Sequence, residues 1–309
     1  MQKGKTYGKR VLYTSQDKAK DIIEVAEEYY NLCTIRGTNE ITIRGYKNAI
    51  KYFNTFNGNY EIDSDSVNRY ILHLKKKGFK NTTINSYIRK LSPIFKYGYS
   101  KGYLPNVTIT EIKVQKVFKD IYTEEELQLL LKEPKEKDFV SIRNWCMVWV
   151  FASTAIRRTE LINLKVMNVD MINRVIMLNY TKNKKYRQIP ISSSLYEVLE
   201  TYLNIRNCNN TDEYLFCTVY NTILSTSTIN KELEKYNHSR GVIQTGIHKY
   251  RHTFITNAVN NNTNALLLQK LTGHSTLKEL NTYYNANTKD IASIINEIAP
   301  KSNSRKKVF

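Results

Sequence analysis

Long apolar segments are absent from this chain of 309 residues. No apolar run approaches the roughly 20 residues that a membrane-spanning helix needs. The longest extends from Trp145 to Ala152, and we read it as part of a buried helix. Residues Met1 to Lys5 are polar, so no secretory signal is visible, and no strongly amphipathic basic helix with an aromatic face is present. We therefore expect a cytoplasmic protein without a membrane partner.

Paired cysteines are also lacking. The four cysteines, Cys33, Cys146, Cys208 and Cys217, form no CxxC pair and show no zinc-ligand spacing. Thiols in a cytoplasmic protein normally stay reduced. We expect neither disulfides nor a structural metal, and we find no internal repeat.

Acidic residues are too few to balance the basic ones. The chain has 28 Asp/Glu against 47 Lys/Arg, a formal net charge of +19 and a pI of about 9.6. Residues 1–120 carry 22 basic and 11 acidic side chains, and residues 121–309 carry 25 and 17. Such an excess favours a polyanionic partner, above all nucleic acid, although a merely soluble basic protein is the alternative. Because both halves are basic, both could contact the same phosphate backbone.

The first hundred residues show four stretches with apolar residues at helical spacing. The apolar positions are Ile22, Ile23, Ala26, Tyr29 and Tyr30; Ile43, Tyr46, Ile50 and Phe53; Val67, Tyr70, Ile71 and Leu74; and Ile84, Tyr87, Ile88, Leu91 and Phe95. The pattern predicts a four-helix domain over residues 21–104, preceded by a basic flexible arm over residues 1–20. Lys75, Lys76 and Lys77 precede Gly78 at a helix end, where they are candidate DNA contacts or a solvated face.

A linker over residues 105–120 follows, where periodicity is lost around Gly102 and Pro105. The second domain, residues 121–299, opens with a capping box at 123–126 before an apolar run. A long apolar helix is expected over 138–154, and short strands over 175–178 and 188–191. The fold class is thus mainly α with a small β-sheet: a helical domain followed by a mixed α/β domain, with a basic tail at 300–309.

The second domain also carries side chains suited to phosphoryl transfer onto a tyrosine. His248, Arg251 and His274 precede Tyr283 by short distances, and Arg157 lies upstream. Arginine holds phosphate oxygens with a planar fork of donors, and histidine and lysine move protons. A tyrosine hydroxyl near such groups could act as a nucleophile.

The arrangement resembles the tyrosine recombinase (phage integrase) family, of the simple two-domain type. Residues 155–161 (AIRRTEL) are similar to the family's Gly-Leu-Arg-x-Ser-Glu-Leu box, and residues 248–254 (HKYRHTF) to its His-x-Leu-Arg-His-Thr-Phe box. Residues 271–277 (LTGHSTL) are similar to Leu-Leu-Gly-His-Ser, and Tyr283 lies nine residues after His274, at the family's nucleophile position. Ala155 replaces the family's glycine, which should matter little if the backbone there is helical.

The resemblance implies a site-specific DNA recombinase without a cofactor. Tyr283 would attack the scissile phosphate and form a 3′-phosphotyrosyl link with a free 5′-hydroxyl. Arg157, Arg251 and His274 would stabilise the transition state, and His248 would assist proton removal or contact the phosphate. The family's catalytic lysine lies eight residues before a proline; Pro190 therefore selects Lys182, which would protonate the leaving oxygen.

Several neighbouring residues compete for these roles. Arg158 stands beside Arg157, and Tyr284 beside Tyr283. Lys184 or Lys185 could replace Lys182; together with Arg187 they are otherwise expected to contact the DNA backbone.

Two further residues lie within these sequence motifs. Glu160, three residues after Arg157, is expected to support the site by orienting an arginine or stabilising the helix. His252 is the alternative to His248, but we expect it to point elsewhere and pack in the core.

The resemblance also implies a C-shaped clamp and a homo-tetramer on two double-stranded DNA recombination sites. An apolar stripe in residues 288–299 (Ile291, Ile294, Ile295 and Ile298) would dock on a neighbouring subunit or pack on its own domain. We expect a nucleoid-associated mobile-element integrase or a Xer-like resolvase, with a possible accessory DNA-bending or directionality protein. The alternatives are a type IB topoisomerase, a non-catalytic DNA-binding protein and a structural or RNA-binding basic protein.

Overall fold

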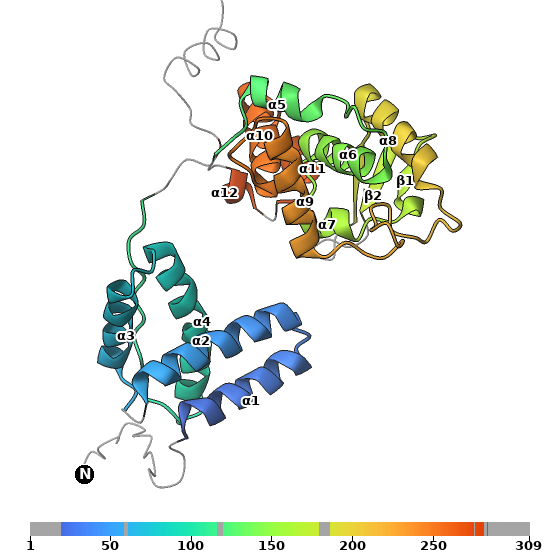
Figure 1. Ribbon diagram of the computed structural model, residues 1–309. Coiled ribbons are helices and arrows are strands. Elements are labelled where there is room, and N and C mark those ends of the chain that lie inside the picture. Colours follow the sequence, from blue (N-terminus) through green and yellow to red (C-terminus); the bar gives the residue numbers. More distant parts are fainter. Residues whose placement is uncertain are drawn as a thin grey trace, which may run out of the picture. The chain divides into compact units, whose positions relative to one another are not determined.

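Figure 1 shows a computed structural model of the chain, which describes residues 20–58, 61–115, 120–178, 186–274, 276–280 and 283. The chain divides into two compact units, residues 1–117 and 118–309. The basic arm, the loop with Lys182, Lys184 and Lys185, the segment 288–299 and the tail 300–309 lie outside the described residues, apart from Lys20 at the end of the arm.

The first unit consists of the four helices that the sequence predicts: α1 (Ile22–Ile35), α2 (Glu40–Asn57), α3 (Ser64–Lys76) and α4 (Asn81–Ser100). Each apolar stripe faces a common core, in which the Phe53 ring meets those of Tyr70 and Phe95 edge-on at 5.3 and 5.5 Å. Local signals set the starts of two of these helices. Asn39 caps α2, and Asp63 forms a reciprocal capping box with Ser66 at α3.

The extended chain after α4 also belongs to the first unit. The buried Asn85 side chain donates to the Ile112 carbonyl (2.8 Å) and accepts from the Ile112 amide (2.9 Å). Val107 and Ile109 pack against the helical core. The stretch up to Ile112 is therefore held on the four helices, whereas the sequence suggested a linker from residue 105.

The second unit begins with three α-helices and a 3-10 helix, and the first two of them carry clear start signals. They are α5 (Glu124–Leu131), α6 (Phe139–Thr154), α7 (Arg158–Ile162) and the 3-10 helix η1 (Val166–Asn168). Thr123 and Glu126 form the predicted capping box at α5, and Asp138 caps α6 by accepting from Val140 and Ser141. Helix α6 is buried along most of its length and forms the centre of the domain's core.

A small antiparallel sheet follows, with strand order β1 (Val169–Asp170), β2 (Val175–Leu178) and β3 (Arg187–Pro190). Leu178 pairs with Arg187, and the connection between β2 and β3 carries Lys182. The two longer strands were predicted, β3 starting one residue earlier than expected. The two-residue β1 was not predicted, because it is too short to show alternation.

Five helices complete the described part of the domain: α8 (Ser193–Arg206), α9 (Thr226–Ser239), α10 (Ile247–Asn260), α11 (Ala265–Thr272) and α12 (Leu277–Leu280). The fold is mainly helical with a small sheet, as predicted. In the described ranges, no helix combines the length and the apolar character needed to cross a bilayer. The four cysteines are free thiols.

A network of buried hydrogen bonds fixes helix α10, which carries much of the candidate site. The Tyr250 hydroxyl donates to Asn237 (2.8 Å), and Asn237 donates to the Tyr122 hydroxyl (2.9 Å). The Tyr122 amide donates to Thr253 Oγ1 (2.8 Å). Buried polar groups are costly when they are unpaired. This network of hydrogen bonds therefore fixes the packing of α9 and α10 against the start of the domain.

Candidate active site

The carboxylate of Glu160 joins two arginines from distant parts of the sequence. Arg157 Nη1 donates to Oε1 (3.0 Å), and Arg187 Nη2 donates to Oε2 (2.8 Å). The Arg157 amide also donates to Oε2 (2.9 Å), as in one half of a capping box at the start of α7. The Glu160 side chain is 2% exposed. The short helix α7 thus carries a buried anion that orients Arg157 and Arg187.

The C-terminus of α11 supplies the other acceptors. The Thr272 carbonyl accepts from Arg187 Nη1 and from Arg251 Nη2, both at 2.8 Å, and the Gly273 carbonyl accepts from Arg157 Nη2 at 2.5 Å. The last carbonyls of a helix lack intrahelical partners and carry partial negative charge. Three guanidinium groups therefore converge on one helix end, and we call Arg157, Arg187 and Arg251 with Glu160 the arginine cluster.

Gly273 makes this convergence possible. Its φ of +66° is the left-handed conformation that commonly ends a helix and favours glycine. A Cβ atom at this position would lie 2.0 Å from Arg187 Nη1 and 3.1 Å from Arg157 Nη1. Both the left-handed backbone and the close approach of the guanidinium groups therefore require glycine, which has no side chain, at this position.

The hydrogen bonds of His274 indicate its tautomer. The Thr272 hydroxyl donates to the Leu268 carbonyl (2.6 Å), so its oxygen accepts from His274 Nδ1 (2.8 Å). His274 Nε2 then carries the lone pair and accepts from Arg251 Nη2 (3.1 Å), since a guanidinium can only donate. His274 and Arg251 are thereby held against each other.

Positive charge in the cluster exceeds negative charge. Three arginines face one carboxylate, and burial together with the nearby Arg157 and Arg187 lowers the pKa of Arg251 to about 10. Burial also lowers the pKa of Arg187, against the opposing effect of Glu160. A guanidinium whose charge is disfavoured in this way gains from a bound anion, because an anion relieves the repulsion.

Arg251 is also anchored to the end of α6, where its Nη1 donates to the Ala155 carbonyl. Ala155 has φ 50° and ψ 27°, so the backbone there is left-handed. The condition under which the replacement of glycine would matter little, a helical backbone at this position, is therefore not met. The family's glycine is suited to this conformation, and an alanine adopts it at a cost of about 1 kcal/mol.

Tyr283 lies beside helix α10 of its own chain. Its hydroxyl is 2.6 Å from His252 Nδ1 and close enough to Arg251 for the cation to oppose the effect of burial on its pKa. Burial is the larger effect and raises the pKa of Tyr283. The tyrosine is therefore a neutral phenol at rest, hydrogen-bonded to a histidine and next to the arginine cluster.

His248 lies one turn before His252 on α10. It lines a cavity of about 320 Å³ between α9 and α10, together with Arg158 and Glu234. Burial, Arg158 and Arg251 lower its pKa, in that order, so the ring is neutral near pH 7. Among the described contacts, no hydrogen bond joins His248 to Tyr283.

Comparison with known proteins identifies the family to which the chain belongs. The phage integrase family matches residues 121–290, and the phage integrase SAM-like domain matches residues 21–114. The chain belongs to the phage integrase family. It is a tyrosine recombinase, an enzyme of site-specific DNA recombination.

Members with similar sequences extend over nearly the whole chain. Tyrosine recombinase XerC of Thermodesulfovibrio yellowstonii is 26% identical over 280 residues, which cover 86% of this chain and 93% of that protein. Tyrosine recombinase XerA of Thermococcus onnurineus is 28% identical over 268 residues, 85% of this chain and 90% of that protein.

Solved structures share the fold. The Tn1549 transposon integrase bound to a circular-intermediate DNA has a TM-score of 0.72, with 19% identity over 89% of this chain and 99% of that one. A XerH recombinase in a post-cleavage complex with a difH substrate has a TM-score of 0.67, with 21% identity over 92% and 90%.

The structure brings together most of the residues predicted for this integrase-family site. Arg157, Arg251 and Glu160 belong to the arginine cluster, and His274 contacts it through Arg251. Tyr283 lies at the edge of the cluster. Lys182, Lys184 and Lys185 lie outside the described residues. The side chains of Lys75, Lys76 and Lys77 are exposed at the end of α3, where they also complement the helix dipole.

Two placements differ from the predictions. Arg187 was expected to be a DNA-backbone contact, but it is 8% exposed and points into the cluster. The alternation of side chains in β3 could have predicted the burial of Arg187. Ile189, two residues later, is a core residue and lies on the same face of the strand as Arg187. His252 was expected to pack in the core, yet it contacts Tyr283. Its spacing of four residues from His248 indicates a shared face of α10.

We predict that Gly273→Ala disrupts the cluster. The new Cβ displaces Arg187 from the Thr272 carbonyl, in addition to the cost of about 1 kcal/mol for the left-handed backbone. Displacing catalytic groups by about 1 Å can lower a rate by roughly 100-fold. Urea unfolding and single-turnover DNA cleavage measure both effects.

Gly241→Ala is the matched control. Gly241 has φ +79° and open space around its Cα, so its substitution carries the backbone cost alone. It should leave the cleavage rate unchanged. Equal losses of activity in both variants would contradict the role of the close approach at Gly273.

Proposed function

We propose that this recombinase cleaves DNA by attack of Tyr283 Oη on the scissile phosphate. The new bond is a 3′-phosphotyrosyl ester, and the leaving group is a 5′-hydroxyl. The proposal is supported above all by one observation: the Tyr283 hydroxyl lies next to a preformed arginine cluster with more positive than negative charge. A covalent intermediate conserves the energy of the phosphodiester, so the strands can be rejoined without ATP.

The cluster residues receive roles from their geometry. Arg157 and Arg251 bind the non-bridging oxygens of the phosphate, because arginine matches them with a planar set of donors. His274 joins them through Arg251, with Nε2 turned toward the guanidinium. Positive side chains aimed at one point stabilise the negative charge that develops on the phosphorane.

Two further roles complete the reaction. Lys182 protonates the leaving 5′-oxygen from the connection between β2 and β3. His248 contacts the phosphate from the neighbouring turn of α10. Glu160 and Arg187 position the other groups: Glu160 orients Arg157, and Arg187 fixes Glu160 on the end of α11.

The chain acts on double-stranded DNA recombination sites as a homo-tetramer. The Tn1549 integrase has been solved in complex with a circular-intermediate DNA and the XerH recombinase with a difH substrate, and the excess of basic residues in both parts of the sequence suits a DNA partner. The exposed Lys75, Lys76 and Lys77 contact the DNA backbone. We place the protein at the nucleoid, as the integrase of a mobile element or a Xer-like resolvase, with an accessory DNA-bending or directionality protein as a further partner.

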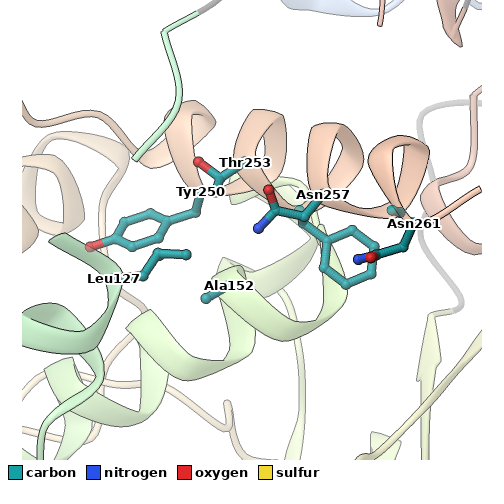
Figure 2. Close-up of a pocket in the computed structure, with 8 residues that line it drawn as sticks. Leu127, Ala152, Tyr250, Thr253, Asn257 and Asn261 are labelled. Atoms are coloured by element: carbon teal, nitrogen blue, oxygen red, sulfur yellow. The ribbon is translucent and has the colours of Figure 1, made fainter. Parts of the chain in front are cut away.

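A groove on the second unit is suited to receive the segment 288–299 of a neighbouring subunit. Figure 2 shows it between α5, α6 and α10, with Leu127 and Ala152 on one side and Asn257 and Asn261 on the other. Its volume is about 240 Å³, and Phe254 and Ala258 add apolar lining. The isoleucine stripe of 288–299 supplies apolar side chains for such a groove.

We expect that wild-type protein traps a covalent complex on a suicide substrate, and that Tyr283→Phe does not. The substrate carries the recombination site with a nick near the cleavage position, and the reaction contains EDTA. A denaturing gel detects the protein–DNA band. A band from the phenylalanine variant would make Tyr284 or another residue the nucleophile. No band from either protein, with DNA binding intact, would favour a non-catalytic DNA-binding protein.

The groove predicts a defect in assembly for Ala258→Trp, because the larger side chain fills the space for the isoleucines. Mass photometry on DNA should show at least a tenfold loss of tetramer, equivalent to about 1.4 kcal/mol, while single subunits still bind. Glu200→Trp, on the exposed face of α8, is the control. Deletion of residues 288–309 should match the Ala258→Trp defect; tetramers of normal stability in both variants would refute docking in this groove.

A further inference from the structure

The hydroxyl of Tyr283 and the ring of His252 form a close pair within one chain. Nδ1 lies 2.6 Å from Oη, and the ring centroids are 5.8 Å apart at an interplanar angle of 43°. This is a short hydrogen bond between a nucleophile and a side chain that can take up a proton near neutral pH. Such a contact is the geometric requirement for a general base.

Helix α10 sets up this pair. His248, Arg251 and His252 have the spacing i, i+3 and i+4, which places them on one side of the helix. Arg251 continues into the cluster, while the next residue, His252, reaches Tyr283. Two adjacent residues of α10 therefore serve the nucleophile: the arginine by its charge and the histidine by a direct contact.

Tyr283 needs a proton acceptor. Because burial raises its pKa, the hydroxyl keeps its proton at neutral pH, and Arg251 offsets this effect only in part. A phenol is a weak nucleophile until its proton is removed. His248 lines the cavity with Arg158, and no described hydrogen bond joins it to Tyr283, whereas His252 already touches the hydroxyl.

We propose that His252 is the general base that deprotonates Tyr283 during DNA cleavage. The inference rests on the proposed function of Tyr283 as nucleophile. As the Tyr283 Oη–phosphorus bond forms, the phenolic proton passes to Nδ1 of His252. The bond from phosphorus to the 5′-oxygen breaks, and that oxygen takes a proton from Lys182.

The same residue serves the reverse step. After cleavage, His252 is an imidazolium beside the phosphotyrosyl oxygen. When the 5′-hydroxyl of the incoming strand attacks phosphorus, its proton passes to Lys182, which gave up its own proton in the forward step. The bond from phosphorus to Tyr283 Oη breaks, and the proton returns from Nδ1 to Oη, so the phenol is restored.

The test compares His252→Ala with wild type in single-turnover cleavage of the suicide substrate. We expect a rate lower by roughly 100- to 10,000-fold, the usual contribution of a general base, with DNA affinity unchanged. Added imidazole should restore part of the rate, and the more basic 4-methylimidazole should restore more. A structural defect would not show this dependence on the base strength of the added compound.

Two variants separate proton transfer from positioning. His252→Gln keeps a hydrogen-bond acceptor but does not take the proton, so it should be as slow as His252→Ala. His238→Ala, which removes an exposed histidine bonded to the Ile243 carbonyl, should cleave at the wild-type rate.

The outcomes distinguish the inference from the proposed function. If wild type forms no covalent complex, the proposed function fails. If wild type cleaves and His252→Gln keeps near-normal rates, His252 only positions the tyrosine and the inference is wrong. Rescue by imidazoles in His248→Ala instead of His252→Ala would assign the base to His248.

Discussion

The buried carboxylate of Glu160 is the interaction on which the site depends. It holds Arg157 from the start of α7 and Arg187 from β3, while the carbonyls at the end of α11 accept from both arginines and from Arg251. An unpaired buried charge is strongly destabilising. The sheet, α7 and α11 therefore have to meet in one arrangement, and that arrangement also orients the arginines that we propose bind the phosphate.

The cluster has a surplus of positive charge before DNA arrives. Three guanidinium groups share one carboxylate, and the lowered pKa of Arg251 reflects burial and the repulsion between neighbours. Oriented cations that are already in place need no rearrangement when negative charge develops, and this preorganisation is a large part of enzymatic catalysis. Tyr283, which is neutral and half-buried, adds the opposite property: as the proposed nucleophile, it stays inactive until its proton is removed.

The sequence predicted the helices well because their apolar stripes repeat with helical spacing, as in α1 to α4. The family boxes located Arg157, Arg251, His274 and Tyr283, and the structure brings these residues together. Arg187 was placed wrongly because its partners, Glu160 and Thr272, are distant in the chain. The left-handed backbone at Ala155 was missed because alanine is a helix former, and only comparison with glycine hints at another conformation.

The most direct test of the central claim is whether one chain supplies both the tyrosine and its arginine cluster. Tyr283→Phe keeps the cluster, and Arg157→Ala keeps the tyrosine. A mixture of the two variants is incubated with the suicide substrate, and the covalent complex is measured. The account predicts no more complex than either variant forms alone, because Tyr283 lies beside Arg251 of its own chain. Restored cleavage, with DNA linked to the Arg157→Ala subunit, would show that the tyrosine acts in a neighbour's site.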